Sequence, residues 1–207
     1  DTNVENLYAM YETVTAAYPV DTSRVYASGT SMGGMASVSL AAAYPEIIAA
    51  IAPNDIAPSL TVDDEQLARL QELVVPMNFT TGLADKYEPY PLSADSTKID
   101  GYNRLLAAFG MDEYAMDAAE SEALAAESMN IVEHATGVSF PSVEVVNYLN
   151  NRLYVCDFAN ENDVALLRIN IVENKPHMFV GYDAQNAWNF LKQFSRDQET
   201  GALVIAD

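Results

Sequence analysis

The sequence predicts an α/β fold in which a mostly parallel sheet is flanked by helices. Three observations lead to this prediction. Apolar, β-prone segments alternate with segments of helical periodicity along most of the chain. The pattern G-x-S-x-G at 29–33 stands between a strand-like and a helix-like segment. With 207 residues, 50% of them hydrophobic, the chain is long enough for one domain with a substantial core.

The expected elements follow one another in a regular order. A first helix is expected over Val4 to Tyr18, and a last helix over Asp183 to Ser195 that buries Ala184, Ala187, Trp188, Leu191 and Phe194. Strands are expected at 25–27, 47–52, 74–81, 152–158 and 164–172, and further helices at 35–43 and 64–72, with a long helical region after residue 92.

The G-x-S-x-G segment predicts a nucleophile, Ser31. A serine on a sharp strand-to-helix turn adopts a strained backbone, and we expect Gly29 and Gly33 to remove Cβ atoms that would clash there. The N–H group of Met32, at the start of the following helix, would then face a developing oxyanion. The alternative interpretation is a Gly/Ser-rich turn without chemistry.

Two histidines are available to act as the base. His177 lies in the segment KPHMF, directly after a strongly β-prone run and before an amphipathic helix. A loop at the carboxyl end of a strand is where such a base is expected. His134 lies in a helical, acidic segment and is expected on the surface. The sequence therefore favours His177.

The acid that would orient His177 is expected to be Asp85. It follows the strand at 74–81 in the segment GLAD, which places its carboxylate at the same sheet edge as Ser31. An ordinary loop or helix-capping aspartate is the alternative. Asp55, after the preceding strand, is the second candidate, and Asp183 is expected to be the N-cap of the last helix.

These residues carry a resemblance to a known family. The segment DTSRVYASGTSMGGMASVSLAAAYPEIIAAIAP resembles the secreted esterases that include polyhydroxybutyrate depolymerases, feruloyl esterases and acetylxylan esterases. A Pro-His pair followed by AWNFLKQF is also similar, whereas the family's glycine-rich approach to the histidine is replaced by Glu173-Asn174-Lys175. The resemblance implies an α/β-hydrolase fold with Ser31, Asp85 and His177 as the catalytic triad of a serine carboxylic-ester hydrolase that needs no cofactor.

The resemblance also implies what the chain lacks. Residues 1–207 correspond to the C-terminal portion of a single catalytic domain, without the strands that precede the first helix in the full fold. One oxyanion donor, Met32 N–H, is present, and the second normally comes from a loop among those strands. We therefore expect a further polypeptide segment to complete the sheet beside 25–27. Residues 92–150 are a candidate helical lid.

The net charge and the single cysteine limit the partners and sites that are expected for this chain. The net charge of −20 argues against nucleic acid and anionic membranes as partners and favours a small or polymeric neutral ester. Acidic residues between Asp112 and Glu133 are accompanied by no Lys or Arg, which predicts a solvated helix face or a lid. Cys156 is expected to be a buried, inert thiol, and no metal-ligand spacing is visible.

Two other functions remain open at this point. A serine peptidase of the prolyl-oligopeptidase type uses the same elbow and the same order of triad residues. A non-catalytic remnant or an assembly module would need neither the elbow nor a catalytic triad. The family resemblance implies an extracellular or periplasmic location, whereas the single cysteine is equally compatible with the cytoplasm.

Overall fold

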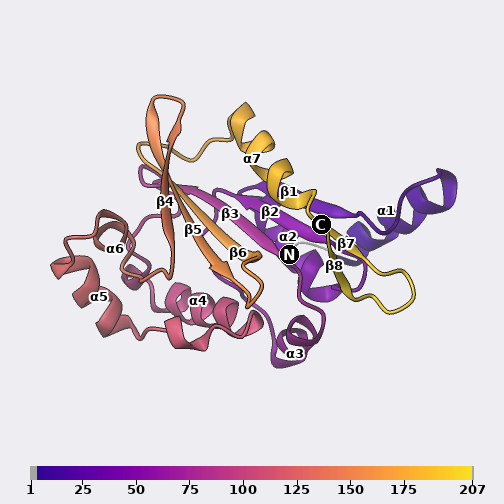
Figure 1. The fold of residues 1–207 in the computed structure, drawn as a ribbon, viewed down its shortest axis with the longest axis horizontal. Coiled ribbons are helices and arrows are strands. Elements are labelled where there is room, and N and C mark those ends of the chain that lie inside the picture. Colours follow the sequence, from indigo (N-terminus) through magenta and orange to yellow (C-terminus); the bar gives the residue numbers. More distant parts are fainter. Residues whose placement is uncertain (1–3, 207) are drawn as a thin grey trace.

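A six-stranded sheet forms the centre of the molecule (Figure 1). The computed structural model describes residues 4–206. The strand order is β1-β2-β3-β6-β5-β4. The first four strands of this order run parallel, and β5 and β4 run antiparallel to their neighbours. Their bounds are β1 Tyr26–Thr30, β2 Ala50–Asn54, β3 Met77–Gly82, β4 Val143–Tyr148, β5 Asn151–Ala159 and β6 Ala165–Val172.

Helices flank both faces of this sheet. On one face lie α2 (Met32–Ala43), α3 (Asp64–Glu72) and α4 (Ser96–Ala108), and on the other lies α7 (Gly181–Leu191). The remaining elements are α1 (Val4–Ala17), α5 (Ala118–Glu127), α6 (Ile131–Thr136), two 3₁₀ turns, η1 (Leu92–Ala94) and η2 (Asp112–Tyr114), and a small hairpin of β7 (Phe194–Arg196) and β8 (Leu203–Ile205). No helix in the described part of the chain is long and apolar enough to cross a membrane.

The two faces of the sheet bury separate hydrophobic cores. Successive side chains of a strand point to opposite faces, so Ile51 packs in the larger core, whereas Ala50 and Ala52 pack against α7. Every residue of β2 and β3 is buried, as expected for parallel strands covered on both sides. The fold is thus a mixed α/β arrangement with a mostly parallel central sheet, as the sequence predicts.

Local signals explain where several helices begin. Asp63 accepts a hydrogen bond from the N–H of Gln66, whose side chain accepts one in return from the N–H of Asp63. Asp117 and Glu120 form the same reciprocal pair at the start of α5. Such capping boxes satisfy N–H groups that have no partner within the helix. The helix at 64–72 lies where the sequence predicts it.

The expected long helical region contains a strand that the sequence analysis missed. Residues 143–148 pair with β5, and four of the six are exposed, so their apolar side chains give only a weak burial pattern.

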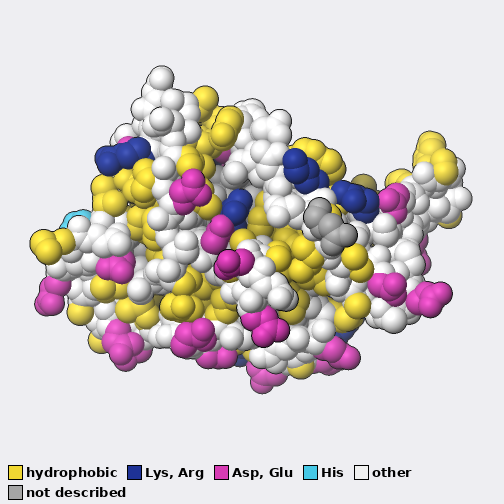
Figure 2. Space-filling model, in the orientation of Figure 1, with side chains coloured by type: hydrophobic (Ala, Val, Ile, Leu, Met, Phe, Trp, Pro, Cys, Tyr) yellow, Lys and Arg dark blue, Asp and Glu magenta, His cyan; other side chains and the backbone are white. Residues whose placement is uncertain are grey.

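Acidic side chains gather along the lower rim of the molecule, below the sheet (Figure 2). Helix α4 buries Ile99, Tyr102, Leu105 and Leu106 in the main core, and the role of 92–150 as a lid stays a prediction.

The last helix also differs from its prediction. It ends at Leu191, and Phe194 belongs to β7 rather than to a helix. Ala184 is exposed and Trp188 is 49% exposed, whereas Phe190, absent from the predicted set, is fully buried. The buried stripe is therefore displaced around the helix, because α7 packs on the small alanines of β2 rather than presenting its largest ring to the core.

Helix α1 and strand β1 form the least buried end of the fold. Helix α1 projects beyond the sheet (Figure 1) and contains no buried residue. Met10 and Val14 are 63% and 48% exposed. In the described part of the chain, β1 pairs with β2 on one side and with no strand on the other. The carboxyl ends of β1, β2, β3 and β6 meet at one edge of the sheet, where ligands of such folds bind.

Candidate active site

Ser31 occupies the sharp turn between β1 and α2. Its backbone has φ 57° and ψ −119°, a conformation that costs roughly 1–3 kcal/mol for a residue other than glycine. The turn is held by a hydrogen bond from Ser31 N–H to the carbonyl of Asn54 (2.9 Å) and by one from Met35 N–H to the carbonyl of Ser31 (3.0 Å). The Ser31 side chain stands at the N-cap position but makes no capping hydrogen bond, so its hydroxyl is not used to stabilise the helix.

Only one of the two glycines expected to relieve the turn does so. A Cβ on Gly29 would lie 2.5 Å from the carbonyl oxygen and 2.8 Å from the Cα of Gly33. A Cβ on Gly33 would have no neighbour within 4 Å, so the prediction that Gly33 prevents a clash is wrong. Gly33 lies in the first turn of α2, where a side chain points away from β1. The tight approach is thus made by Gly29 against the backbone of Gly33.

The loops after β3 and β6 are joined to each other. Ala84 N–H donates to the carbonyl of Lys175 (3.1 Å), and Leu83 N–H donates to the carbonyl of Val172 (3.0 Å). Gly82 permits this approach, because a Cβ there would lie 2.6 Å from the carbonyl carbon of Lys175 and would overlap its oxygen. The two loops therefore form one unit at the carboxyl edge of the sheet.

Within this unit Asp85 contacts His177. The distance from Asp85 Oδ2 to His177 Nδ1 is 2.8 Å. The other carboxylate oxygen of Asp85 accepts the N–H groups of Tyr87 (2.8 Å) and Glu88 (3.1 Å). The Tyr87 ring packs against the His177 ring at a centroid distance of 4.9 Å. Both oxygens of Asp85 are thus engaged, and the imidazole is fixed by its Nδ1 atom and by one face.

Electrostatics keep Asp85 ionised. Burial raises the pKa of Asp85, but the hydrogen bonds from His177, Tyr87 and Glu88 together outweigh burial and hold that pKa below its usual range. The Asp85 side chain is fully buried, whereas the His177 side chain is 19% exposed. The arrangement can accept a proton on the imidazole and stabilise the resulting positive charge.

Ser31 lies at the same edge but on another strand. It follows β1, whereas Asp85 and His177 follow β3 and β6, and neighbouring strands are about 4.8 Å apart. The loop of His177 extends back toward the end of β2, because Lys175, two residues before His177, pairs there with Asp55. Among the described residues no hydrogen bond joins Ser31 Oγ to His177, so the structure brings the acid and the base together without closing the contact to the serine.

Lys175 is a site residue that the sequence analysis did not single out. Its ammonium group pairs with Asp55 and lies 3.9 Å from Asp183, and its side chain is only 4% exposed. Asp55 therefore faces Lys175 and is not hydrogen-bonded to His177. Asp183 is not the N-cap of α7 but lies in its first turn, where its carboxylate accepts the N–H of Val180 (2.9 Å). The place of Lys175 in Glu173-Asn174-Lys175, two residues before His177, was the available signal.

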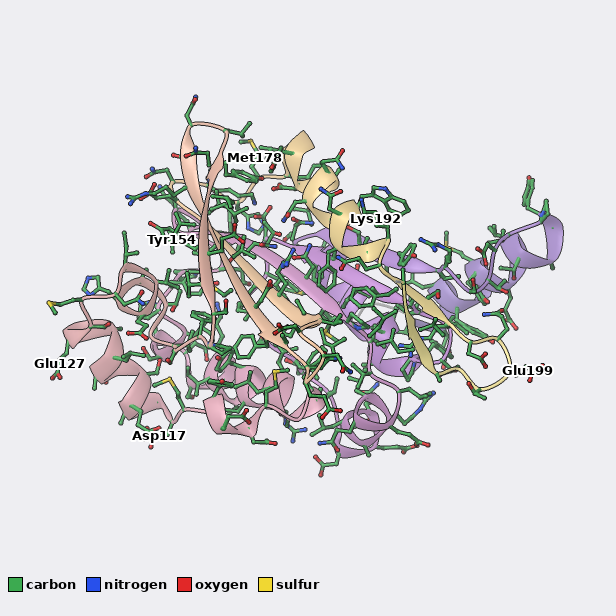
Figure 3. All side chains as sticks on the ribbon, viewed as in Figure 1. Asp117, Glu127, Tyr154, Met178, Lys192 and Glu199 are labelled. Atoms are coloured by element: carbon green, nitrogen blue, oxygen red, sulfur yellow. The ribbon has the colours of Figure 1, made fainter. Side chains whose placement is uncertain are left out.

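A cavity of about 420 Å³ adjoins the elbow helix. Met35, one turn after Ser31, contributes to it, as does Glu88, whose N–H binds Asp85. Glu88 is paired with Lys98 at 2.8 Å. The rest of the lining combines apolar side chains with hydroxyl groups: Val38, Ile56, Ala57, Ser39, Ser59, Thr61 and Thr97. Met178, beside His177, lies on the loop between β6 and α7 and is 51% exposed (Figure 3).

The remaining candidates lie away from this edge. His134 is exposed in α6, as expected. Cys156 is a free, buried thiol in β5. Within residues 4–206, no group of three or more His, Cys, Asp or Glu side chains could hold a metal ion.

Comparisons with known proteins support the fold. No protein-family model and no curated protein matches the chain. Its fold is similar to that of a solved structure of acetyl xylan esterase from Aspergillus awamori, with a TM-score of 0.53 and 15% sequence identity. The alignment covers 92% of this chain and 67% of that one. At this identity the likeness concerns the fold: an esterase shares the mostly parallel sheet flanked by helices.

Proposed function

We propose that the protein is a serine hydrolase of the α/β-hydrolase type that cleaves a carboxylic ester through an acyl-enzyme. One observation carries the proposal. A serine with a strained backbone, whose hydroxyl makes no capping bond, stands at the same sheet edge as an imidazole hydrogen-bonded to a buried carboxylate. Strained backbone conformations are concentrated at the functional sites of proteins. The structural likeness to an acetyl xylan esterase supports ester chemistry at the general level.

The proposed reaction uses each residue in one role. Ser31 Oγ attacks the acyl carbon while His177 Nε2 takes its proton, and the same proton is returned to the departing alcohol. Water then attacks the acyl-enzyme with His177 again as the base, which releases the acid and restores Ser31. Asp85 holds the Nδ1 atom of His177 and stabilises the imidazolium. Serine–histidine hydrogen bonds are often long in free enzymes and tighten with substrate.

The oxyanion formed in each step needs hydrogen-bond donors. The N–H of Met32, at the N-terminal end of α2, is one donor, and the partial positive charge of the helix end adds to it. We propose that the second donor belongs to a further polypeptide segment that lies along the free edge of β1. That edge adjoins the elbow, so a loop leaving such a segment would reach the oxyanion.

The substrate is proposed to be a neutral ester, carbohydrate-linked or aliphatic. The cavity lined by Met35 of the elbow helix and by Glu88 offers hydroxyl groups and apolar side chains, and its two charges, Glu88 and Lys98, neutralise each other. A net charge of −20 opposes the approach of acidic polymers. Both features favour an uncharged ligand.

Replacing Ser31 by alanine tests the proposal. With p-nitrophenyl acetate as substrate, Ser31→Ala should abolish hydrolysis and labelling by a fluorophosphonate probe while the thermal unfolding midpoint stays near that of the wild type. Ser28→Ala, in the preceding strand, is the matched control; it removes a hydroxyl that donates to the carbonyl of Ala52 (2.8 Å) and should keep the activity. Hydrolysis by Ser31→Ala, or labelling of another residue in it, would remove Ser31 from the mechanism.

A further inference from the structure

Four buried polar side chains lie beneath the loop that carries His177. Lys175 pairs with Asp55 and lies 3.9 Å from Asp183, and the hydroxyl of Tyr148 donates to Asp183. The side chain of Lys175 is 4% exposed, and those of Asp55 and Asp183 are fully buried. The four residues come from the end of β2, the end of β4, the loop after β6 and the first turn of α7.

Burying a cluster of this kind costs folding free energy. Burying an ion pair rarely adds to stability, because the loss of hydration of both charges offsets their attraction. Apolar side chains of similar volume would fill the same space at lower cost. The position of Lys175, two residues before His177, indicates that the cluster serves the imidazole.

Lys175 is anchored at both of its ends. Its carbonyl accepts the N–H of Ala84 after β3, and its ammonium group reaches Asp55 after β2. Asp55 is itself rigid, since its N–H donates to the carbonyl of Thr80 (2.8 Å) and its backbone has φ 51°. The chain that leads into His177 is thereby held across two strands, on the side of the sheet edge where β1 and Ser31 lie.

The pair also decides which carboxylate serves His177. Asp55 Oδ1 is taken by Lys175, and Asp55 Oδ2 is buried and has no hydrogen-bond partner among the described residues. Burial raises the pKa of Asp55, and the hydrogen bond and charge of Lys175 oppose that rise, as does the nearby imidazole. Without Lys175, both oxygens of the buried Asp55 would lack a partner, and its side chain would be free to turn toward the His177 loop in competition with Asp85.

We propose that Lys175 and Asp55 are positioning residues for His177: their buried ion pair fixes the histidine loop over β2 and leaves Asp85 as the only carboxylate that the imidazole contacts. This inference rests on the proposed function, because the histidine it positions is the proposed base. Neither residue touches the reacting atoms.

Four variants test the proposal: Lys175→Met, Lys175→Arg, Asp55→Asn and the double variant Lys175→Met/Asp55→Asn. Lys192→Met, which removes an exposed lysine at the end of α7 (Figure 3), is the matched control for the loss of one charge. Each protein is assayed for kcat and KM with p-nitrophenyl acetate. The thermal unfolding midpoint of each variant is measured alongside, so that a loss of folding is separated from a loss of kcat.

Lys175→Met should lower kcat by about 10- to 100-fold with little change in KM, since a displacement of the base by about 1 Å costs up to that much. Lys175→Arg should recover most of the loss. Asp55→Asn should lower kcat to a similar extent, because it leaves the buried ammonium group of Lys175 without its main carboxylate partner.

The double variant decides the case even if Lys175→Met does not fold, because it removes both charges of the pair and leaves Asp183 with the Tyr148 hydroxyl and the Val180 N–H. Its kcat should stay about 10-fold low with little change in KM, since the anchor is absent. Wild-type kcat in the folded double variant, or a loss that appears only in KM, would overturn the proposal. An inactive wild type, or an active Ser31→Ala, would instead contradict the proposed function.

Discussion

Replacing Gly29 by alanine should damage the elbow, and the structure gives the size of the damage. The added Cβ would lie 2.5 Å from the carbonyl oxygen of Gly33, whereas ordinary contacts begin at 3.4 Å, so the two backbones must separate by about 0.9 Å. The atoms in the way belong to the backbone, so no side chain can rotate to make room. Overpacking of this kind destabilises by about 1–3 kcal/mol. A shift of about 1 Å at a nucleophile can lower kcat by about 100-fold.

The matched control lies four residues further along the chain. Gly33→Ala places its Cβ in open space on a helix, so it should stabilise the fold by up to about 1 kcal/mol and retain activity on a short ester. Both variants are compared with the wild type by kcat on p-nitrophenyl acetate and by denaturant unfolding. Equal losses in both variants, or wild-type kcat in Gly29→Ala, would refute the argument from backbone contact.

Three further predictions concern side chains. Asp85→Asn should lower kcat by on the order of 10³–10⁴-fold, because an amide favours the wrong tautomer of His177. The fold lowers the pKa of Asp85, so the stability that its ionised carboxylate contributes is present above an unfolded pKa of about 3.9. That contribution is lost as the pH falls through the pKa of Asp85 in the folded protein. The unfolding midpoints of Asp85→Asn and of the wild type should therefore converge at acidic pH. Cys156 should resist a thiol reagent until the protein unfolds, since burial raises its pKa. Arg196→Leu should cost about 3 kcal/mol in unfolding free energy, because the carbonyls of Ile48, Gly201 and Val74 lose the donors of its guanidinium. Burial lowers the pKa of Arg196 to about 10, so relief of that burial offsets a part of the loss. At temperatures below its unfolding transition, the variant should keep its kcat.

The parts of the fold that the sequence predicts well are those with a local cause. A strand buried on both faces reads as an apolar run, and α3 starts directly after its N-cap Asp63 and ends at Glu72 because capping and periodicity agree. The turn at Ser31 can be recognised in the sequence because the glycine and the serine that it requires lie within a few residues of one another. The contact of Asp85 with His177 follows from order alone, since both come after parallel strands.

The features that the sequence did not predict depend on distant partners. Strand β4 is mostly exposed and owes its conformation to pairing with β5, so its side chains carry no clear period. Lys175 resembles a surface lysine until β2 places Asp55 beside it. Glycine is needed at position 29 and not at 33, because a Cβ at 29 would meet the backbone of Gly33 at the turn, whereas a Cβ at 33 would meet no neighbour. Each of these depends on three-dimensional neighbours rather than on spacing.

The final prediction concerns the free edge of β1. Val25 C=O accepts the N–H of Ala49, just before β2, and Ser31 N–H donates to Asn54, the last residue of β2. Backbone groups alternate in direction along a strand, so the N–H of Ser28 faces away from β2. Open edges of this kind invite pairing with another chain, and α1 adds exposed apolar side chains such as Met10 and Val14. Ser28→Pro removes that outward N–H at an edge position where proline is tolerated, whereas Ser28→Ala keeps it.

We therefore expect a further polypeptide segment beside β1, and the mass of the active species tests this directly. Size-exclusion chromatography with native mass spectrometry should find the active species heavier than the 22.6 kDa of this chain. Ser28→Pro should dissociate it and abolish ester hydrolysis, because the second oxyanion donor leaves with the added segment, while Ser28→Ala should behave as the wild type. A monomer of 22.6 kDa that unfolds cooperatively and hydrolyses the ester at full rate would show that β1 needs no neighbour and that Met32 N–H alone, or a donor within residues 1–207, stabilises the oxyanion.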